Sequence, residues 1–129
     1  MKISNEYPPN IEDIRKVLKL HEGIVFTYGD TLYNPSGAHI GTDLMRHEET
    51  HTVQQEKIGV KDWWKKYLSD SAFRVSQETE AYRNQYDAAK KMIRDKNALY
   101  LFRRQIATWL SGEMYGNSIT FNDAFDSIY

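Results

Sequence analysis

The sequence predicts an α+β fold that is mainly helical. Most of the chain places apolar residues three and four positions apart, which is the spacing of amphipathic helices. One stretch in the first third instead gathers β-branched and aromatic residues around a Gly-Asp pair, a pattern typical of a short β-hairpin. The length of 129 residues and the hydrophobic content of 40% suit one domain with its own core. We therefore expect a single domain over residues 1–129, with no internal repeat and no linker.

A first amphipathic helix is predicted after the Pro-Pro-Asn sequence. Apolar side chains recur at helical spacing from Ile11 to Leu18, and His21 continues the same face. Asn10 is a suitable N-cap, because its side chain can accept a hydrogen bond from the first turn. Gly23 is a suitable stop, since glycine readily adopts the backbone conformation that ends a helix.

The stretch GIVFTYGDTLYNPSG, residues 23–37, is predicted to form a β-hairpin. Gly29 and Asp30 separate two runs of β-branched and aromatic residues, and such a pair suits a tight turn between two strands. The segment closes on Asn-Pro-Ser-Gly, which is typical of a loop. We expect these two strands to be the only ones in the fold.

The rest of the chain is predicted to be helical. A helix from about Thr42 to Ile58 has Thr42 or Asp43 available as its N-cap and Gly59 as its terminator. The same periodicity continues through most of the following sequence. Further helices are predicted at residues 61–69, 72–97 and 97–112, and a short last one begins near Asn122.

Composition limits the kinds of partner and of metal site. The 17 basic and 18 acidic residues are scattered and give a formal net charge of −1, so no basic face for nucleic acid is indicated. Because the chain has no cysteine, a metal ion would have to be held by His, Asp or Glu. The opening residues lack an apolar leader pattern, and no later apolar run approaches the roughly 20 residues of a membrane span. We therefore expect a cytoplasmic protein that does not act at a membrane.

The sequence RHEETH contains two of the four histidines of the chain. On a helix, His47 and His51 project from one face about one turn apart, so both imidazoles can reach a single ion. Glu48 directly follows the first histidine and would face water activated by that ion, where a carboxylate acts as a general base. Two histidines from one helix need a further ligand, and SQETEAYRNQ supplies Glu78 and Glu80 as candidates.

Two plainer interpretations apply to the same residues. Histidines on the inner face of a helix also occur in buried structural networks that hold no metal. Glu78 and Glu80 also fit a solvated charged stripe on an exposed helix, with Arg83 as an ion-pair partner. Arg46 and Arg83 are accordingly expected to pair with nearby glutamates.

HEETH followed by ETEAY resembles the pattern of gluzincin-type zinc metallopeptidases, especially their minimal single-domain members and the related small HExxH proteins of bacteria and phages. The resemblance implies a zincin-like fold and a peptidase that uses one zinc ion. Its ligands would be His47, His51 and a glutamate in an E-x-x-A pattern, which matches Glu78. Glu48 would be the general base, and Glu80 would lie beside the ligands or replace Glu78.

The resemblance also implies a peptide or an unfolded protein as the substrate. In the family, a strand edge beside the motif helix pairs with an extended peptide, and GIVFTYG or TLYNP would supply that edge here. Larger relatives use a Tyr or His to stabilise the oxyanion, and Tyr82, Tyr115 and His39 are the candidates. The competing function is a non-catalytic module, in which the same zinc site stabilises a peptide-binding or interaction domain. A metal-free interaction protein is the third alternative.

Several polar and aromatic residues near the motif have two interpretations. Gln54 and Gln55 can hold a ligand or a backbone carbonyl, but we expect them to be exposed helix residues. The aromatic residues of KDWWKKY form either a wall for substrate or core packing against the motif helix. The segment 110–125 is expected to be a loop and a short helix, with a tail that shapes the cleft as the alternative. His21 and His39 are expected to be ordinary surface residues.

Overall fold

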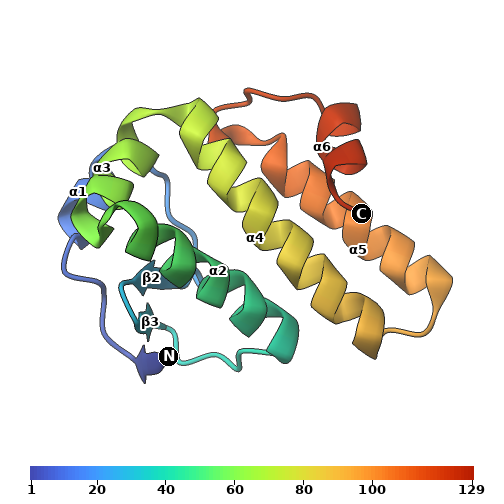
Figure 1. The fold of residues 1–129 in the computed structure, drawn as a ribbon, viewed down its shortest axis with the longest axis horizontal. Coiled ribbons are helices and arrows are strands. Elements are labelled where there is room, and N and C mark those ends of the chain that lie inside the picture. The colour runs from blue at the N-terminus through green and yellow to red at the C-terminus, as the bar shows by residue number, and fades with distance from the viewer.

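The computed structural model describes residues 1–129 and has the mainly helical α+β fold that the sequence predicts, with 63% of the chain in helices. In chain order the elements are β1 (Lys2–Ser4), α1 (Ile11–Val17), β2 (Phe26–Tyr28), β3 (Thr31–Tyr33), α2 (Thr42–Ile58), α3 (Val60–Ser69), α4 (Ser71–Met92), α5 (Lys96–Leu110), the 3-10 turn η1 (Glu113–Tyr115) and α6 (Phe121–Ser127). Helices α2 and α4 lie side by side, and α5 runs along the other side of α4 (Figure 1). The sheet, α1 and α3 gather on the side of α2.

The sheet has the strand order β1-β3-β2, so β2 lies at one edge and β3 in the middle. Strands β2 and β3 form the predicted hairpin, with Thr27 opposite Leu32 and Gly29 in the turn at a φ of 64°. Strand β1 pairs in parallel with β3, with Ile3 opposite Leu32. The expectation that the hairpin holds the only strands is therefore wrong, because a three-residue strand has no alternation long enough to detect.

Helix α2 has the predicted bounds, but its first turn is not capped as expected. The N-cap is Gly41, whose backbone carbonyl accepts a hydrogen bond from the Met45 N–H, and no side chain caps the helix. Thr42 and Asp43 lie inside the first turn instead. At the other end Gly59 takes a φ of 94°, which favours glycine and ends the helix.

Three other helix ends differ from the sequence prediction. Helix α1 stops at Val17, well before Gly23, because Leu18 takes up extended backbone and buries its side chain in the core. Asn10 is the N-cap residue of α1 as predicted, but its side chain makes no capping bond, and its amide atoms are buried without a partner. Helix α4 stops at Met92, because Asp95 caps the separate helix α5 by accepting a hydrogen bond from the Asn97 N–H.

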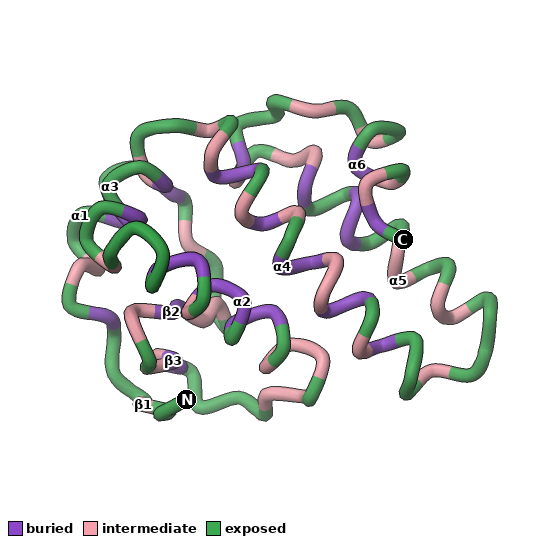
Figure 2. The backbone as a smooth tube through the Cα atoms, viewed as in Figure 1, coloured by how far each residue is buried: buried purple, intermediate pink, exposed green.

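Two apolar clusters flank the α2–α4 pair. One packs α4, α5, η1 and α6 together around Ile106, Leu110 and Ile128, which are fully buried. The other packs α1, β2 and α3 together around Ile14 and Trp63. Figure 2 shows that both α2 and α4 bury residues along the faces they turn toward each other. The buried face of α2 is nevertheless polar throughout, consisting of His47, Glu48, Thr50, His51, Gln54 and Gln55.

Candidate metal centre

The polar inner face of α2 meets one acidic residue of α4. His47 and His51 are each 4% exposed, and Glu78, which lies on α4, is 5% exposed. Their spacing of four residues places both imidazoles on the helix face that α4 covers. Burial of polar and ionisable groups is unfavourable unless they are paired, so this concentration of them marks a candidate functional site.

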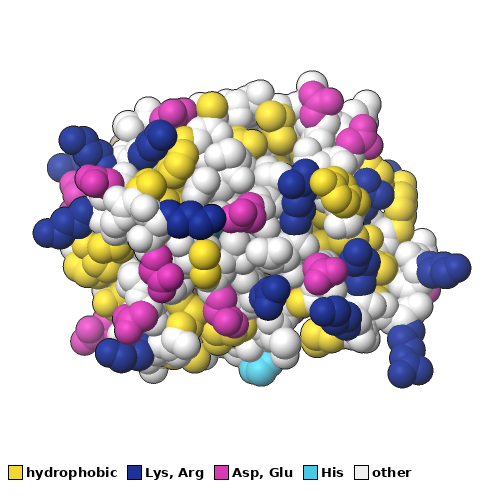
Figure 3. Space-filling model, in the orientation of Figure 1, with side chains coloured by type: hydrophobic (Ala, Val, Ile, Leu, Met, Phe, Trp, Pro, Cys, Tyr) yellow, Lys and Arg dark blue, Asp and Glu magenta, His cyan; other side chains and the backbone are white.

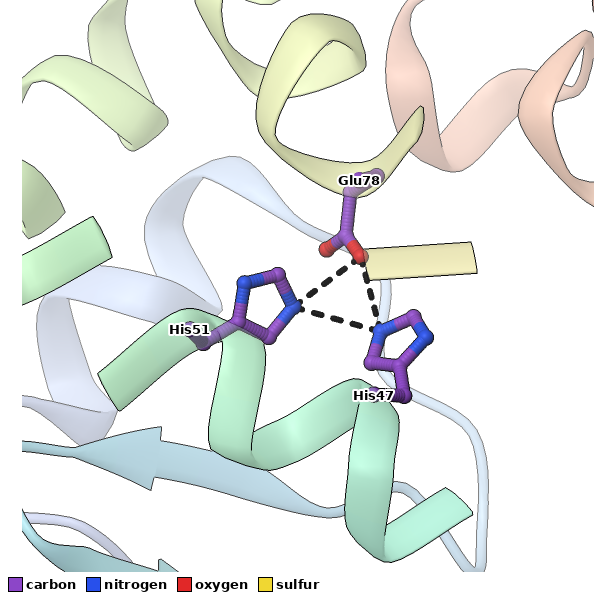
Figure 4. Close-up of side chains that lie close together, drawn as sticks. All are labelled: His47, His51 and Glu78. Atoms are coloured by element: carbon purple, nitrogen blue, oxygen red, sulfur yellow. Dashed lines mark hydrogen bonds and ion pairs between the residues drawn. The ribbon is translucent and has the colours of Figure 1, made fainter. Parts of the chain in front are cut away.

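The three side chains converge on one point (Figure 4). Glu78 Oε1 lies 3.0 Å from His47 Nε2 and 3.1 Å from His51 Nε2, and the two Nε2 atoms are 3.2 Å apart. Bonds of 2.0–2.1 Å in a tetrahedral zinc site separate neighbouring ligand atoms by about 3.3–3.4 Å. The three donor atoms lie slightly closer together than this, and the three residues are close enough to hold one metal ion.

A glutamine side chain contacts the Nδ1 atom of each histidine. His47 Nδ1 lies 3.0 Å from Gln85 Oε1, and His51 Nδ1 lies 2.8 Å from Gln54 Oε1. Gln55 forms different bonds: its amide accepts from the Gly29 N–H and donates to the carbonyl of the hairpin strand β2. The expectation that Gln54 and Gln55 are exposed is wrong, since both are buried against elements that the helix pattern alone does not reveal.

Electrostatics couple Glu78 to the histidines. Burial alone would raise the pKa of the Glu78 carboxyl, but the adjacent His51 and His47 hold it below its usual range. Burial alone would lower the pKa of His51, yet the Glu78 carboxylate raises it to about 9. In the metal-free protein His51 is therefore protonated at neutral pH and forms an ion pair with Glu78. It must release that proton before its Nε2 atom can bind a metal.

Glu48 lies beside the three donors without joining them. Its Oε2 atom accepts a hydrogen bond of 2.6 Å from the Thr27 hydroxyl on β2, and its Oε1 atom is 4.0 Å from His47 Nε2. Both Glu48 and Thr27 are buried. One carboxylate oxygen is thus fixed by the hairpin, while the other faces the histidines.

The donors lie in a cleft of about 530 Å³ whose lining residues are more than half hydrophobic. Three buried tyrosines line it, namely Tyr67, Tyr82 and Tyr115. The Tyr67 hydroxyl donates a hydrogen bond of 2.5 Å to Glu78 Oε2. Burial, and then the nearby Glu78 carboxylate, raises the pKa of all three tyrosines, so they remain hydrogen-bond donors at neutral pH.

The structure decides between several of the sequence interpretations of the cleft. The aromatic residues Trp63, Trp64 and Tyr67 are both core and wall, since they are buried and also line the cleft. The segment after α5 also lines the cleft through residues 112–115, so the tail does shape it. His39 is exposed and outside the cleft, so it cannot serve as an oxyanion donor there.

Glu80 and the two arginines have other roles than ligand or ion-pair partner. Glu80 is exposed, and its Oε1 atom accepts a hydrogen bond of 2.9 Å from Gln54 Nε2. Arg83 donates to the Ser127 carbonyl and stacks on the Tyr129 ring, because the chain end folds back onto α4. Neither Arg46 nor Arg83 forms a salt bridge, so the expected pairing with glutamates is wrong.

Sequence reasoning missed Gln85 and Thr27 altogether. Gln85 lies seven residues after Glu78 on the same face of α4, a spacing of two helical turns that would have identified it once Glu78 was placed. Thr27 carries no such signal, because its contact with Glu48 depends on how the hairpin packs against α2. Its strand, β2, lies at an edge of the sheet, whereas TLYNP lies in the central strand β3 and offers no free edge. Of the two segments, GIVFTYG alone includes an edge strand.

Comparison with known proteins gives no match, whether with protein-family models, curated proteins or solved structures. None of the helices is both long enough and apolar enough to cross a membrane. On the face shown in Figure 3, acidic and basic side chains are interspersed. Fold and site by themselves thus define an α+β protein with a candidate His-His-Glu metal centre in a largely apolar cleft.

Proposed function

We propose that the protein is a zinc-dependent metallopeptidase of the gluzincin type, with a zincin-like fold, that hydrolyses peptide bonds. One observation carries the proposal. The donor atoms of His47, His51 and Glu78 converge in a cleft of about 530 Å³, with the Glu48 carboxylate beside them. Catalytic zinc sites combine three such ligands with a position left for water or substrate.

A metal that only stabilised the fold would be held differently. Structural zinc sites close all four positions with protein ligands, and they need no carboxylate base beside the ligands. Here three residues form the donor group, and the nearest further carboxylate, that of Glu48, is 4.0 Å from His47 Nε2. The donor set therefore favours the peptidase over the alternative, a non-catalytic zinc-stabilised peptide-binding or interaction module.

The protein residues have distinct tasks in this proposal. His47, His51 and Glu78 hold the ion, which when bound polarises the scissile carbonyl and lowers the pKa of water to about 7. Glu48 accepts a proton at its Oε1 atom and passes it to the departing amine. Thr27 keeps Glu48 in place by occupying the Oε2 atom. Tyr82 and Tyr115 are protonated donors that line the same cleft, which suits stabilisation of an oxyanion.

The cleft also indicates how a peptide would lie in it. At β2 itself the outward carbonyl of Thr27 is already taken by the side chains of Gln55 and Trp64. The preceding residues Gly23–Val25 line the cleft, and they pair with no strand of the sheet. An extended peptide can pair with this segment in the manner of an added strand.

The charges in the cleft restrict which peptide bonds it can accept. Its lining includes Glu48, Glu78 and Glu113 but no lysine or arginine. Apart from the two candidate ligands, His21 is the only basic side chain of the lining, so a peptide carboxyl terminus finds no permanently charged cation among the side chains to bind it. We infer that the substrate is an internal segment of a peptide or unfolded protein, with apolar side chains against the aromatic wall.

The test compares wild type with Glu48→Gln. We expect the purified wild type to bind one zinc ion per chain and to cleave an unfolded protein or a mixed peptide library, with cleavage sites located by mass spectrometry. Glu48→Gln should keep its zinc and lose at least about a hundredfold in cleavage rate, the contribution of a general base. Equal cleavage by both proteins, or a wild type with zinc and no cleavage of any peptide, would reject the proposal.

A further inference from the structure

Both candidate histidine ligands are linked to a carboxylate through a glutamine. On one side, Asp43 Oδ2 accepts a hydrogen bond of 3.0 Å from Gln85 Nε2, and Gln85 Oε1 lies 3.0 Å from His47 Nδ1. On the other side, Glu80 Oε1 accepts a hydrogen bond of 2.9 Å from Gln54 Nε2, and Gln54 Oε1 lies 2.8 Å from His51 Nδ1. The two arrangements repeat the same order: carboxylate, amide, imidazole.

The carboxylates fix which way each amide points. An ionised carboxylate only accepts hydrogen bonds, so it holds the Nε2 end of the glutamine and leaves the Oε1 end for the histidine. Gln54 is fixed twice, since its Nε2 atom also donates to the backbone carbonyl of Gln77. An amide oxygen likewise only accepts, so the Nδ1 atoms of His47 and His51 must carry the hydrogen.

A neutral imidazole with its hydrogen on Nδ1 has its lone pair on Nε2. The Nε2 atoms of both histidines are the ones that meet at Glu78 Oε1. We propose that Gln54 and Gln85 are positioning residues that hold both histidines in the tautomer and ring orientation that bind the ion, with Glu80 and Asp43 as their anchors. This inference rests on the metal centre of the proposed function, not on its peptidase activity.

An amide between carboxylate and imidazole has a different effect from a carboxylate placed directly on the ring. A direct carboxylate orients the ring and also raises the basicity of the ligand. The glutamine orients the ring while keeping the full negative charge of Glu80 or Asp43 one residue away. The glutamines thus fix geometry at a site that already contains the negative charges of Glu78 and Glu48.

The test measures zinc affinity by competition with a chromophoric chelator, for Gln54→Leu, Gln85→Leu and a matched control. The control is Gln55→Leu, on the same helix and equally buried, whose amide bonds the hairpin and no histidine. We expect each of the first two variants to lose about 10–100-fold in affinity, the usual effect of removing the partner of a ligand. The control should keep wild-type affinity, and metal-free thermal unfolding will register any loss of folding separately.

An exchange of the amide and the carboxylate provides a second test that does not depend on the leucine variants folding. Gln85→Glu alone places two carboxylates where Gln85 Nε2 and Asp43 Oδ2 now lie 3.0 Å apart, and should weaken zinc binding. Adding Asp43→Asn restores a donor beside an acceptor, and should recover the affinity by about tenfold or more.

Three results would overturn the inference. They are equal zinc affinities of the glutamine variants and the control, no recovery in the exchange variant, and a wild type that binds no zinc at all. The last would also remove the proposed function. A wild type that binds zinc without cleaving peptides, with the variants behaving as expected, would reject the peptidase and leave this inference standing.

Discussion

Zinc binding at neutral pH should release a proton from His51. The Glu78 carboxylate, acting against the effect of burial, raises the pKa of this imidazole to about 9. A group with that pKa is about 0.99 protonated at pH 7, about 0.5 at pH 9 and about 0.1 at pH 10. Since zinc binds the neutral imidazole, nearly one proton must leave His51 for each ion bound at pH 7. The His51 share of this release should halve at pH 9, while zinc-bound water, with a pKa of about 7, releases a further proton over the same range. Zinc affinity should rise with pH from 7 to 9.

Calorimetric titration of the metal-free protein with zinc measures this release directly. Repeating the titration in buffers of different ionisation enthalpy gives the number of protons released, and doing so from pH 7 to pH 10 gives its pH dependence. A total release below about one proton per zinc ion at pH 7, or a zinc affinity that is independent of pH below 9, would refute the argument. It would mean that Glu78 and His51 do not form an ion pair in the metal-free protein.

The ion pair and the hydrogen bonds around it lead to three further predictions. The metal-free protein should be most stable to urea between about pH 4.5 and 6.5. The raised pKa of His51 stabilises the fold fully below pH 6.5, and this effect is lost as the pH rises through about 9. The lowered pKa of Glu78 stabilises the fold fully above pH 4.5, and this effect is lost as the pH falls further. Tyr67→Phe should destabilise the metal-free protein by about 1.5–3 kcal/mol in urea unfolding at pH 7, because the buried Glu78 carboxylate loses a hydrogen bond. Thr27→Val should lower peptide cleavage by about ten- to a hundredfold at unchanged zinc content, because Glu48 loses the donor that positions it.

Matched variants separate these effects from general damage to the fold. Tyr86→Phe also alters a buried tyrosine, but this one lies on α4, packs in the apolar cluster and forms no hydrogen bond with Glu78, so its effect on stability should be small. Thr27→Ser keeps the hydroxyl and should keep most of the activity that Thr27→Val loses. A Tyr86→Phe effect as large as that of Tyr67→Phe, or equal activities for the two Thr27 variants, would contradict the assigned contacts.

The sequence predicts the part of the site that depends on local geometry. His47 and His51 meet because four residues make about one helical turn, and α2 has its predicted bounds because the chain has Gly59 where the helix must stop. The choice of Glu78 over Glu80 as the third ligand depends on tertiary packing and not on local helix geometry. Both lie on α4, and only the rotation of that helix against α2 buries Glu78 at the histidines and leaves Glu80 exposed.

The glutamines show why the rest was not predictable. A glutamine on a helix is usually solvated, and only its place on the helix face of the histidines, three residues after His51, distinguishes Gln54 from an exposed residue such as Glu56. Gln54 is buried because α4 brings Glu80 and the Gln77 carbonyl to it, from a segment more than twenty residues away. Strand β1 was missed for a related reason, since its only partner is β3 and its own three residues form no pattern.

The completeness of these hydrogen bonds implies how the protein behaves without metal. A helix with a polar inner face is stable only if its buried groups have partners, because an unpaired buried polar group costs about 1–3 kcal/mol. The only buried side-chain atoms without a partner belong to Asn10, at the start of α1, while every such atom around the candidate ligands has a partner within hydrogen-bonding distance. The metal-free site is therefore compatible with a folded protein. Chelation should abolish activity yet leave the circular dichroism and cooperative unfolding of the protein in place, and zinc should restore the activity. Cooperative unfolding on chelation would instead assign the zinc a structural role, which the three-residue donor group does not support.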